Sequence, residues 1–231
     1  MPYEPREDSF LLKKHIKDFC KLSFSVLDLG TGSGVLAKEA AKYSKDVTAS
    51  DIDKELIRNL KKQHNQKNVN NINLKKSKTS LQKFDIKKSL ISNNINNITF
   101  IHSDLFQKIK DKFDLIIFNP PYLSSKPIKT KSVTTKNSRD INKSSNNSND
   151  IINEACKDLA LDGGKNGTEI IEKFLKQAKR YLKKDGKVLL LASSLNKNIE
   201  SLFKKYGCNY RLLDEEKFFF EKLYVWVLNF N

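Results

Sequence analysis

The tetrapeptide Asn119-Pro120-Pro121-Tyr122 combines groups that can hold a planar NH2 group in place. Each proline fixes its own φ and restricts the residue before it, so the Asn119 side chain and the Pro120 carbonyl are predicted to keep one arrangement. A planar NH2 is a poor nucleophile, and two carbonyl oxygens that accept its hydrogens return electron density to the nitrogen. Tyr122 is expected to stack on the planar face. Taken alone, the tetrapeptide is equally compatible with an ordinary proline turn.

A glycine-rich turn lies upstream of the tetrapeptide. Gly30, Gly32 and Gly34 alternate directly after the apolar run 24–29. Glycine accepts positive φ and has no Cβ, so a nucleoside or an amino acid can approach such a backbone closely. A dinucleotide-binding turn requires glycine where this chain has Val35, which disfavours a pyrophosphate at the helix N-terminus. The turn therefore predicts a pocket for another kind of cofactor.

Three aspartates are predicted at the ends of successive strands, beside this turn. They are Asp28, Asp51 and Asp104. Asp51 ends the second strand, where a carboxylate can accept both hydroxyls of a ribose. Asp53 competes for this role but is better suited to begin the next helix. A single aspartate at such a position is more often a cap or a turn residue, but three together favour one pocket.

Alternating apolar runs and segments of helical period predict the elements that position these residues. Their order predicts an α/β fold with a mostly parallel sheet and helices on both faces. Thr168 is the expected N-cap of one helix, and Gly207 closes another. Strands are predicted at 24–29, 46–50, 98–101, 113–118, 187–192 and 223–228, and helices at 9–19, 34–43, 53–67, 169–182 and 196–206.

The 231 residues suit a single domain, 1–231, without an internal repeat. Segments near 70–97 and 124–149 are rich in Asn, Lys and Ser and poor in apolar residues, so they are predicted to be extended insertions. The net charge of +16 suits a nucleic-acid surface, but much of the excess lies in these biased tracts, which favours solvated lysines without a ligand.

The distribution of cysteine, histidine and apolar residues limits the remaining classes. The three cysteines are scattered and form no disulfide framework, and the three histidines are not at metal-ligand spacing. We therefore expect no metal site and a reducing compartment, the cytoplasm with the nucleus as the alternative. No apolar run is long enough to span a membrane.

The two motifs, 26–34 and 119–122, resemble those of class I S-adenosylmethionine-dependent methyltransferases that act on glutamine amides or on the amines of adenine and cytosine. The resemblance implies a Rossmann-like sheet with an antiparallel C-terminal strand. It also implies that Asp28 and the three glycines surround the methionine part of S-adenosyl-L-methionine, with Asp51 at the ribose and Asp104 at the adenine amino group. S-adenosyl-L-homocysteine would be the product.

Two further segments resemble the archaeal and eukaryotic branch of the HemK-like glutamine methyltransferases. Residues 3–12 match its start, which implies that Ser9 contacts the methionine carboxylate. Residues 158–167 match a loop of the same branch that either shapes the substrate mouth or caps a helix. The family pattern places Asn119 beside the cofactor as well as in the catalytic set. The residues implied to bind the substrate are Asn119, Pro120, Pro121, Tyr122 and Leu123.

Members of this branch carry out N5-methylation of the glutamine in the Gly-Gly-Gln motif of class 1 peptide chain release factors, a modification in translation termination. The resemblance implies the same reaction here, together with the small zinc-binding activator subunit that eukaryotic members usually need.

Two other functions remain as alternatives. An N6-adenine methyltransferase acting on DNA or RNA would meet the same planar NH2, but no target-recognition region is found. A non-catalytic partner-binding subunit is disfavoured because every expected cofactor and target residue is present.

Overall fold

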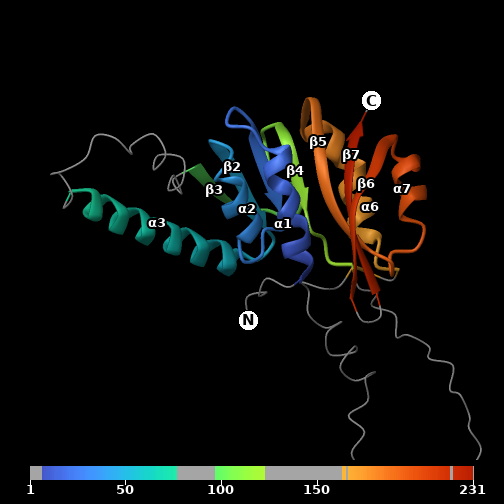
Figure 1. The fold of residues 1–231 in the computed structure, drawn as a ribbon, viewed down its shortest axis with the longest axis horizontal. Coiled ribbons are helices and arrows are strands. Elements are labelled where there is room, and N and C mark those ends of the chain that lie inside the picture. The colour runs from blue at the N-terminus through green and yellow to red at the C-terminus, as the bar shows by residue number, and fades with distance from the viewer. Residues whose placement is uncertain (1–6, 77–96, 123–162, 165, 219–220, 231) are drawn as a thin grey trace, which may run out of the picture.

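The computed structural model describes residues 7–76, 97–122, 163–164, 166–218 and 221–230 (Figure 1). Within these residues the strands are β1 Ser25–Leu29, β2 Asp46–Asp51, β3 Ile98–His102, β4 Phe113–Phe118, β5 Leu182–Ser193, β6 Cys208–Phe218 and β7 Glu221–Phe230. The helices are α1 Glu7–Phe19, α2 Val35–Ala40, α3 Lys54–Lys76, α6 Glu169–Ala178, the 3-10 turn Lys179–Tyr181 and α7 Ile199–Lys205.

The strands form one seven-stranded sheet in the order β3-β2-β1-β4-β5-β7-β6. The first five in this order are parallel, and β7 pairs antiparallel with both β5 and β6. Leu29 at the end of β1 is in register with Ser50 of β2 and Phe118 of β4. The loops that follow these three strands therefore open at the same edge of the sheet. The mostly parallel sheet with an antiparallel C-terminal strand is as predicted.

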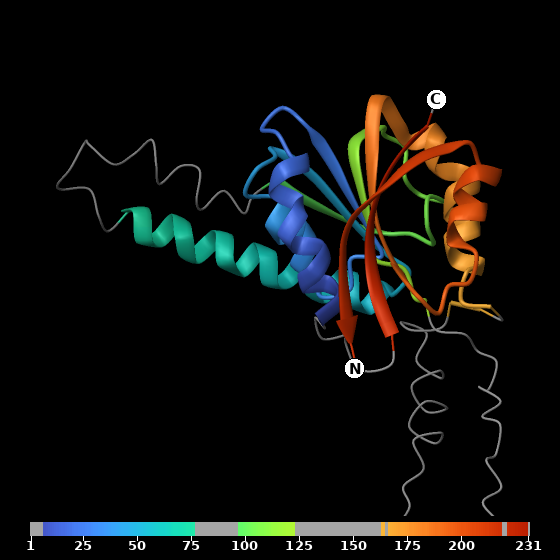
Figure 2. The ribbon, with the colours of Figure 1, turned by 45° about the vertical axis from the view of Figure 1, so that its right-hand side comes forward.

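Helices cover both faces of the sheet (Figures 1 and 2). Consecutive residues of a strand point to opposite faces, and Val26 and Leu27 of β1 accordingly belong to two different core clusters. Val26 packs in a cluster with Leu12 of α1 and Ile57 of α3, whereas Leu27 packs with Phe174 of α6. The predicted α/β fold with helices on both faces is confirmed.

The predicted end of α3 is wrong. The helix was expected to stop at residue 67, and residues from 70 onward were assigned to an insertion, but α3 continues to Lys76. The segment contains no glycine or proline, so a polar composition weakens the helix without ending it. Residues 77–96 and the second predicted insertion, 124–149, lie outside the described residues.

The C-terminal half differs from the prediction at several places. Helix α7 begins at Ile199 rather than at residue 196. Strand β6 was not predicted, because most of its side chains are exposed or only partly buried and give no clear apolar pattern. Helix α6 ends at Ala178 rather than at residue 182, and β5 begins directly after the 3-10 turn. Thr168 occupies the N-cap position but makes no capping hydrogen bond through its side chain. Gly207 closes α7 as predicted, with φ of 67°.

Candidate active site

The glycine turn connects β1 to α2 in a conformation that favours glycine. Gly30, Gly32 and Gly34 have φ of 68°, 50° and 74°, all in the left-handed region. The backbone amide of Thr31 donates to the carbonyl oxygen of Ser50 at 2.8 Å, which ties the turn to the end of β2. The turn therefore lies at the edge of the sheet where the parallel strands end.

Asp28 stabilises this turn with one carboxylate oxygen. Its Oδ2 accepts hydrogen bonds from the Thr31 hydroxyl at 2.6 Å and the Ala37 amide at 2.9 Å. Its Oδ1 is buried and has no hydrogen-bond partner. Burial raises the pKa of Asp28 to about 6, against the lowering effect of the two hydrogen bonds and with a small contribution from the charge of Asp51. A buried acceptor without a partner is costly, so a cationic or hydrogen-bonding ligand would be stabilised here.

Asp51 is joined directly to the glycine turn. Its Oδ2 accepts from the Gly32 amide at 2.9 Å, and its Oδ1 accepts from the Asp53 amide at 3.0 Å. Each carboxylate oxygen can accept a second hydrogen bond, so the carboxylate keeps capacity for hydroxyl groups. Asp53 accepts from the amides of Glu55 and Leu56 and so caps α3, as predicted.

Asp104 reaches the same edge of the sheet through its neighbour. The backbone amide of Ser103 donates to the Asp51 carbonyl oxygen at 2.8 Å, which places the loop after β3 beside the end of β2. The Asp104 side chain is exposed and accepts from Gln107 Nε2 at 3.1 Å. The predicted contact with an adenine amino group stays a prediction. Asp28 lies within β1, Asp51 is the last residue of β2, and Asp104 follows β3, the strand next to β2.

Asn119 follows β4, with its side chain held by α1. Its Nδ2 donates to the Ser9 hydroxyl oxygen at 3.2 Å, and Ser9 is buried with 4% of its surface exposed. The Oδ1 atom of Asn119 is buried and has no hydrogen-bond partner. The structure brings Ser9 to Asn119, and the expected contact of Ser9 with the methionine carboxylate stays a prediction. The Asn119 amide group therefore keeps its carbonyl oxygen available for a ligand.

The rest of the tetrapeptide packs against a second glycine-containing segment, the glycine loop, which carries Gly163 and Gly167. A Cβ added to Gly163 would lie 2.8 Å from the Pro121 carbonyl oxygen, and one added to Gly167 would lie 2.5 Å from that of Tyr122. The Tyr122 side chain is 8% exposed and belongs to the core cluster on the α1 side of the sheet. Part of the predicted loop 158–167 thus lies against the tetrapeptide. Residues 158–162, Lys165 and Leu123 lie outside the described residues.

Comparison with known proteins identifies the family. A model described as a methyltransferase domain matches residues 26–91. A putative protein N5-glutamine methyltransferase of Methanocaldococcus jannaschii is 32% identical over 226 residues, which cover 96% of this chain and 89% of that protein. The chain belongs to the protein N5-glutamine methyltransferase family. It is therefore an enzyme, and S-adenosyl-L-methionine is its methyl donor.

Other methyltransferases resemble the chain over different shares of their length. The release factor glutamine methyltransferase of Buchnera aphidicola is 30% identical over 205 residues. The match covers 88% of this chain and 59% of the Buchnera protein. Among solved structures, the E. cuniculi Mtq2-Trm112 complex, responsible for methylation of the eRF1 translation termination factor, matches with a TM-score of 0.59 and 19% identity. The match covers 99% of this chain and 98% of that one, so the two share the fold.

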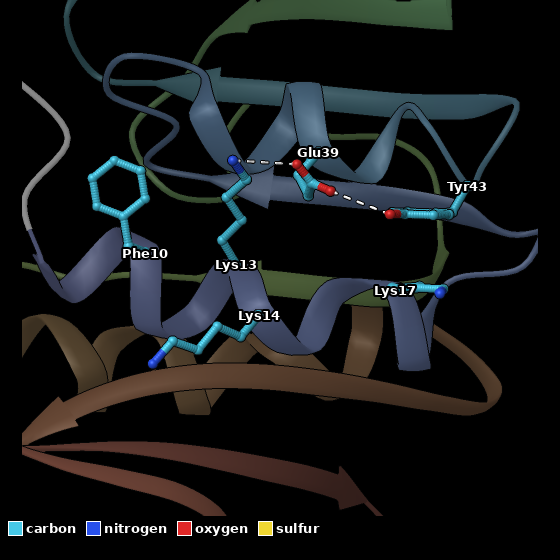
Figure 3. Close-up of a pocket in the computed structure, with 6 residues that line it drawn as sticks. All are labelled: Phe10, Lys13, Lys14, Lys17, Glu39 and Tyr43. Carbon is cyan, nitrogen blue, oxygen red and sulfur yellow. Dashed lines mark hydrogen bonds and ion pairs between the residues drawn. The ribbon is translucent and has the colours of Figure 1, made fainter. Parts of the chain in front are cut away.

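A separate pocket lies beside α1 and α2 of the methyltransferase (Figure 3). Its volume is about 410 Å³, and its lining residues are Phe10, Lys13, Lys14, Lys17, Glu39 and Tyr43. Glu39 already forms ion pairs with Lys13 at 3.4 Å and Lys42 at 2.7 Å. None of the lining residues is among the predicted site residues, so we assign the pocket no role in methyl transfer.

Sequence reasoning missed one residue that contacts the tetrapeptide. Asn196, in the loop after β5, is 3% exposed and donates hydrogen bonds to the backbone of both Tyr122 and Gly167. No sequence signal distinguishes this asparagine from the many others in the chain. Within the described residues, no cluster of acidic, histidine or cysteine side chains could hold a metal ion, and no helix combines the length and apolar character needed to cross a membrane.

Proposed function

We propose that the enzyme methylates the side-chain amide nitrogen of the glutamine in the Gly-Gly-Gln motif of a class 1 peptide chain release factor. The observation that carries the proposal is the buried Oδ1 of Asn119, which has no partner and lies at the end of the strand next to the glycine turn. A primary amide has N–H groups that such an oxygen can accept. The names of the relatives from Methanocaldococcus and Buchnera support glutamine as the target.

On the methyl-donor side, the residues present fit S-adenosyl-L-methionine, which supplies a methyl group on a positively charged sulfur. We propose that Asp28 and the three glycines hold its methionine part. The unpartnered Oδ1 of Asp28 supports this assignment because a cationic ligand would offset the cost of a buried carboxylate. We assign Asp51 to the ribose, where its bond to Gly32 orients the carboxylate, and Asp104 to the adenine.

On the target side, we propose that Asn119 Oδ1 and the Pro120 carbonyl oxygen accept the two hydrogens of the glutamine NH2. Both acceptors draw electron density toward the target nitrogen and aim it at the methyl group. Ser9 takes the Nδ2 end of Asn119, so the carbonyl end is left for the substrate. The nitrogen becomes acidic only as its bond to the methyl group forms, so no residue needs to act as a general base beforehand. Tyr122 and Leu123 complete the proposed substrate-binding set.

The remaining features of the assembly are also proposals. We infer that residues 1–231 contribute one methyltransferase domain of the archaeal and eukaryotic branch, which acts in the cytoplasm where translation takes place. We further propose a small zinc-binding activator subunit as its partner. The E. cuniculi relative, whose structure was solved as a complex with Trm112, supports the existence of a partner subunit.

Transfer of labelled methyl from S-adenosyl-L-methionine tests the proposed substrate. The acceptors are a termination factor with an intact Gly-Gly-Gln loop, its Gly-Gly-Asn variant, and unmethylated DNA and RNA, each with and without the candidate zinc-binding subunit. Label on the Gly-Gly-Gln factor alone is the expected result. Label on nucleic acid alone would replace glutamine with adenine as the target, an outcome that the net charge of +16 makes worth measuring.

A further inference from the structure

Asn196 connects the tetrapeptide to the glycine loop through its side-chain amide. Its Nδ2 donates to the Tyr122 carbonyl oxygen at 3.0 Å and to the Gly167 carbonyl oxygen at 2.6 Å. Its Oδ1 accepts the backbone amide of Ser193, at the end of β5, at 2.8 Å. One buried side chain thus links the end of β5 to two segments that lie far from it in the sequence.

The chemistry of this link requires asparagine. Both N–H groups of Asn196 are used on backbone carbonyls, and its oxygen is used on an amide. An aspartate at this position would place a carboxylate oxygen against two carbonyl oxygens, with no hydrogen between them. An alanine would leave the Tyr122 and Gly167 carbonyls and the Ser193 amide without these partners in a buried place, which is costly for each group.

The glycine loop lies close enough for one amide to bridge both segments. Gly167 has φ of 73°, and a Cβ on this residue would lie 2.5 Å from the Tyr122 carbonyl oxygen and 3.1 Å from Asn196 Nδ2. The loop backbone and the tetrapeptide backbone are therefore in direct contact. Asn196 fixes the Tyr122 carbonyl from the β5 side of this contact.

The two prolines carry this constraint to the reacting end of the tetrapeptide. Between the two carbonyls, Pro121 fixes its own φ and restricts the ψ of Pro120, which leaves fewer free rotations than in an ordinary tripeptide. A bond that orients Tyr122 consequently restricts the direction of the Pro120 carbonyl oxygen, which is assigned above to a hydrogen of the target NH2.

We propose that Asn196 is a positioning residue for methyl transfer, acting through the Tyr122 carbonyl to orient the acceptors of the tetrapeptide. The inference rests on the proposed function, because it concerns the orientation of a planar NH2 group. It predicts a defect in the rate of transfer rather than in the affinity for the methyl donor, since Asn196 contacts neither the glycine turn nor the three aspartates that we assign to the methyl donor.

The test compares Asn196→Ala and Asn196→Asp with a matched control, Asn97→Ala. Asn97 also donates its Nδ2 to two backbone carbonyls, those of Ala41 and Ser44, but it lies before β3 and not at the tetrapeptide. The measured quantities are kcat and KM for the Gly-Gly-Gln factor, the Kd of S-adenosyl-L-methionine, and the thermal midpoint. We expect both Asn196 variants to lose kcat by about 10- to 100-fold with the methyl-donor Kd within about two-fold of the wild type.

The control separates positioning from loss of stability. Asn97→Ala should lower the thermal midpoint and leave kcat unchanged. A folded Asn196→Ala with wild-type kcat would overturn the inference, and so would an equal loss of kcat in Asn97→Ala. If the Asn196 variants do not fold, Gly167→Ala tests the same contact, because its new Cβ meets the Tyr122 carbonyl from the loop side. Wild-type kcat in that variant would equally count against the role of this contact.

Failure of the proposed function is recognisable separately. If the wild type transfers no label to the Gly-Gly-Gln factor, the glutamine assignment fails regardless of any variant. Hydrogen exchange at the Asn119 and Tyr122 amides, measured in the wild type and the three asparagine variants, then still tests the link. We expect faster exchange at these positions in both Asn196 variants only, and unchanged exchange would overturn the inference.

Discussion

The Nδ2 atom of Asn119 donates to the Ser9 hydroxyl oxygen at 3.2 Å, although 110 positions separate the two residues in the chain. A serine hydroxyl can accept as well as donate a hydrogen bond, and here it accepts from the amide nitrogen while the amide oxygen has no partner. Ser9 takes the nitrogen, and the unpartnered oxygen is the atom that a target NH2 requires. Helix α1 therefore contacts Asn119 as well as packing into the core.

Replacing Ser9 with alanine distinguishes its two suggested roles. The hydroxyl was predicted to contact the methionine carboxylate, whereas the structure places it on Asn119. If orientation of Asn119 is its role, Ser9→Ala should lower kcat by about five-fold, the equivalent of one modest hydrogen bond, and leave the methyl-donor Kd unchanged. Isothermal titration for Kd and steady-state kinetics for kcat give the two values. A weaker Kd with normal kcat would restore the cofactor role.

Removal of the Asn119 side-chain amide should stop transfer. We expect Asn119→Ala to reduce kcat by about 100-fold or more, in the range that loss of one preorganised hydrogen-bonding group costs other enzymes. Affinity for the methyl donor should remain largely intact, because the glycine turn and Asp28 do not depend on Asn119. Turnover close to that of the wild type would remove the mechanism proposed here.

The binding of S-adenosyl-L-methionine should weaken in mild acid. Burial raises the pKa of Asp28 to about 6, so its charge is lost as the pH falls through this value. A cationic ligand binds the ionised form, and the Kd is therefore expected to rise by up to about ten-fold between pH 7 and pH 5. Asp28→Asn, which cannot ionise, should bind more weakly at pH 7 and show no such rise. A pH-independent Kd in the wild type would argue against a contact between Asp28 and the methyl donor.

Asp51 and Asp53 are close in sequence, but their substitution should affect different properties, the affinity for the methyl donor and the stability of the fold. Asp53 caps α3 through two backbone amides, so Asp53→Ala should lower the free energy of unfolding by about 1 kcal/mol. Its methyl-donor Kd should stay near that of the wild type. Asp51→Ala should raise the Kd instead, because this carboxylate is assigned to the ribose and orients Gly32. Denaturant titration and calorimetry on both variants check this, and exchanged phenotypes would reverse the assignment.

Local sequence patterns predicted the glycine turn and the cap of α3 correctly. The glycine turn could be recognised because positive φ is a property of single residues, and Asp53 because its cap is formed with residues two and three positions away. The role of Asn196 depends instead on backbone atoms 74 and 29 positions away, which no local pattern encodes. The contact between Ser9 and Asn119 escaped prediction for the same reason.

The strand errors have a different physical cause. Strand β4 is almost wholly apolar and buried, and its bounds agree with the predicted 113–118. Strand β6 lies at the edge of the sheet and exposes much of its length. Its apolar and polar residues therefore alternate too weakly for the strand to be recognised from the sequence. Edge strands derive their order largely from the backbone of a neighbour, here β7.

The position of β7 between β5 and β6 has a consequence for how the molecule is assembled during folding. Because β6 precedes β7 in the chain but touches the sheet only through it, β6 can join the sheet only after β7 or together with it as a hairpin. The hairpin also anchors α1, through the pairs His15–Asp214 and Lys14–Glu216. Because α1 also carries Ser9, the hairpin ties the C-terminal strands to the helix that contacts the Asn119 side chain.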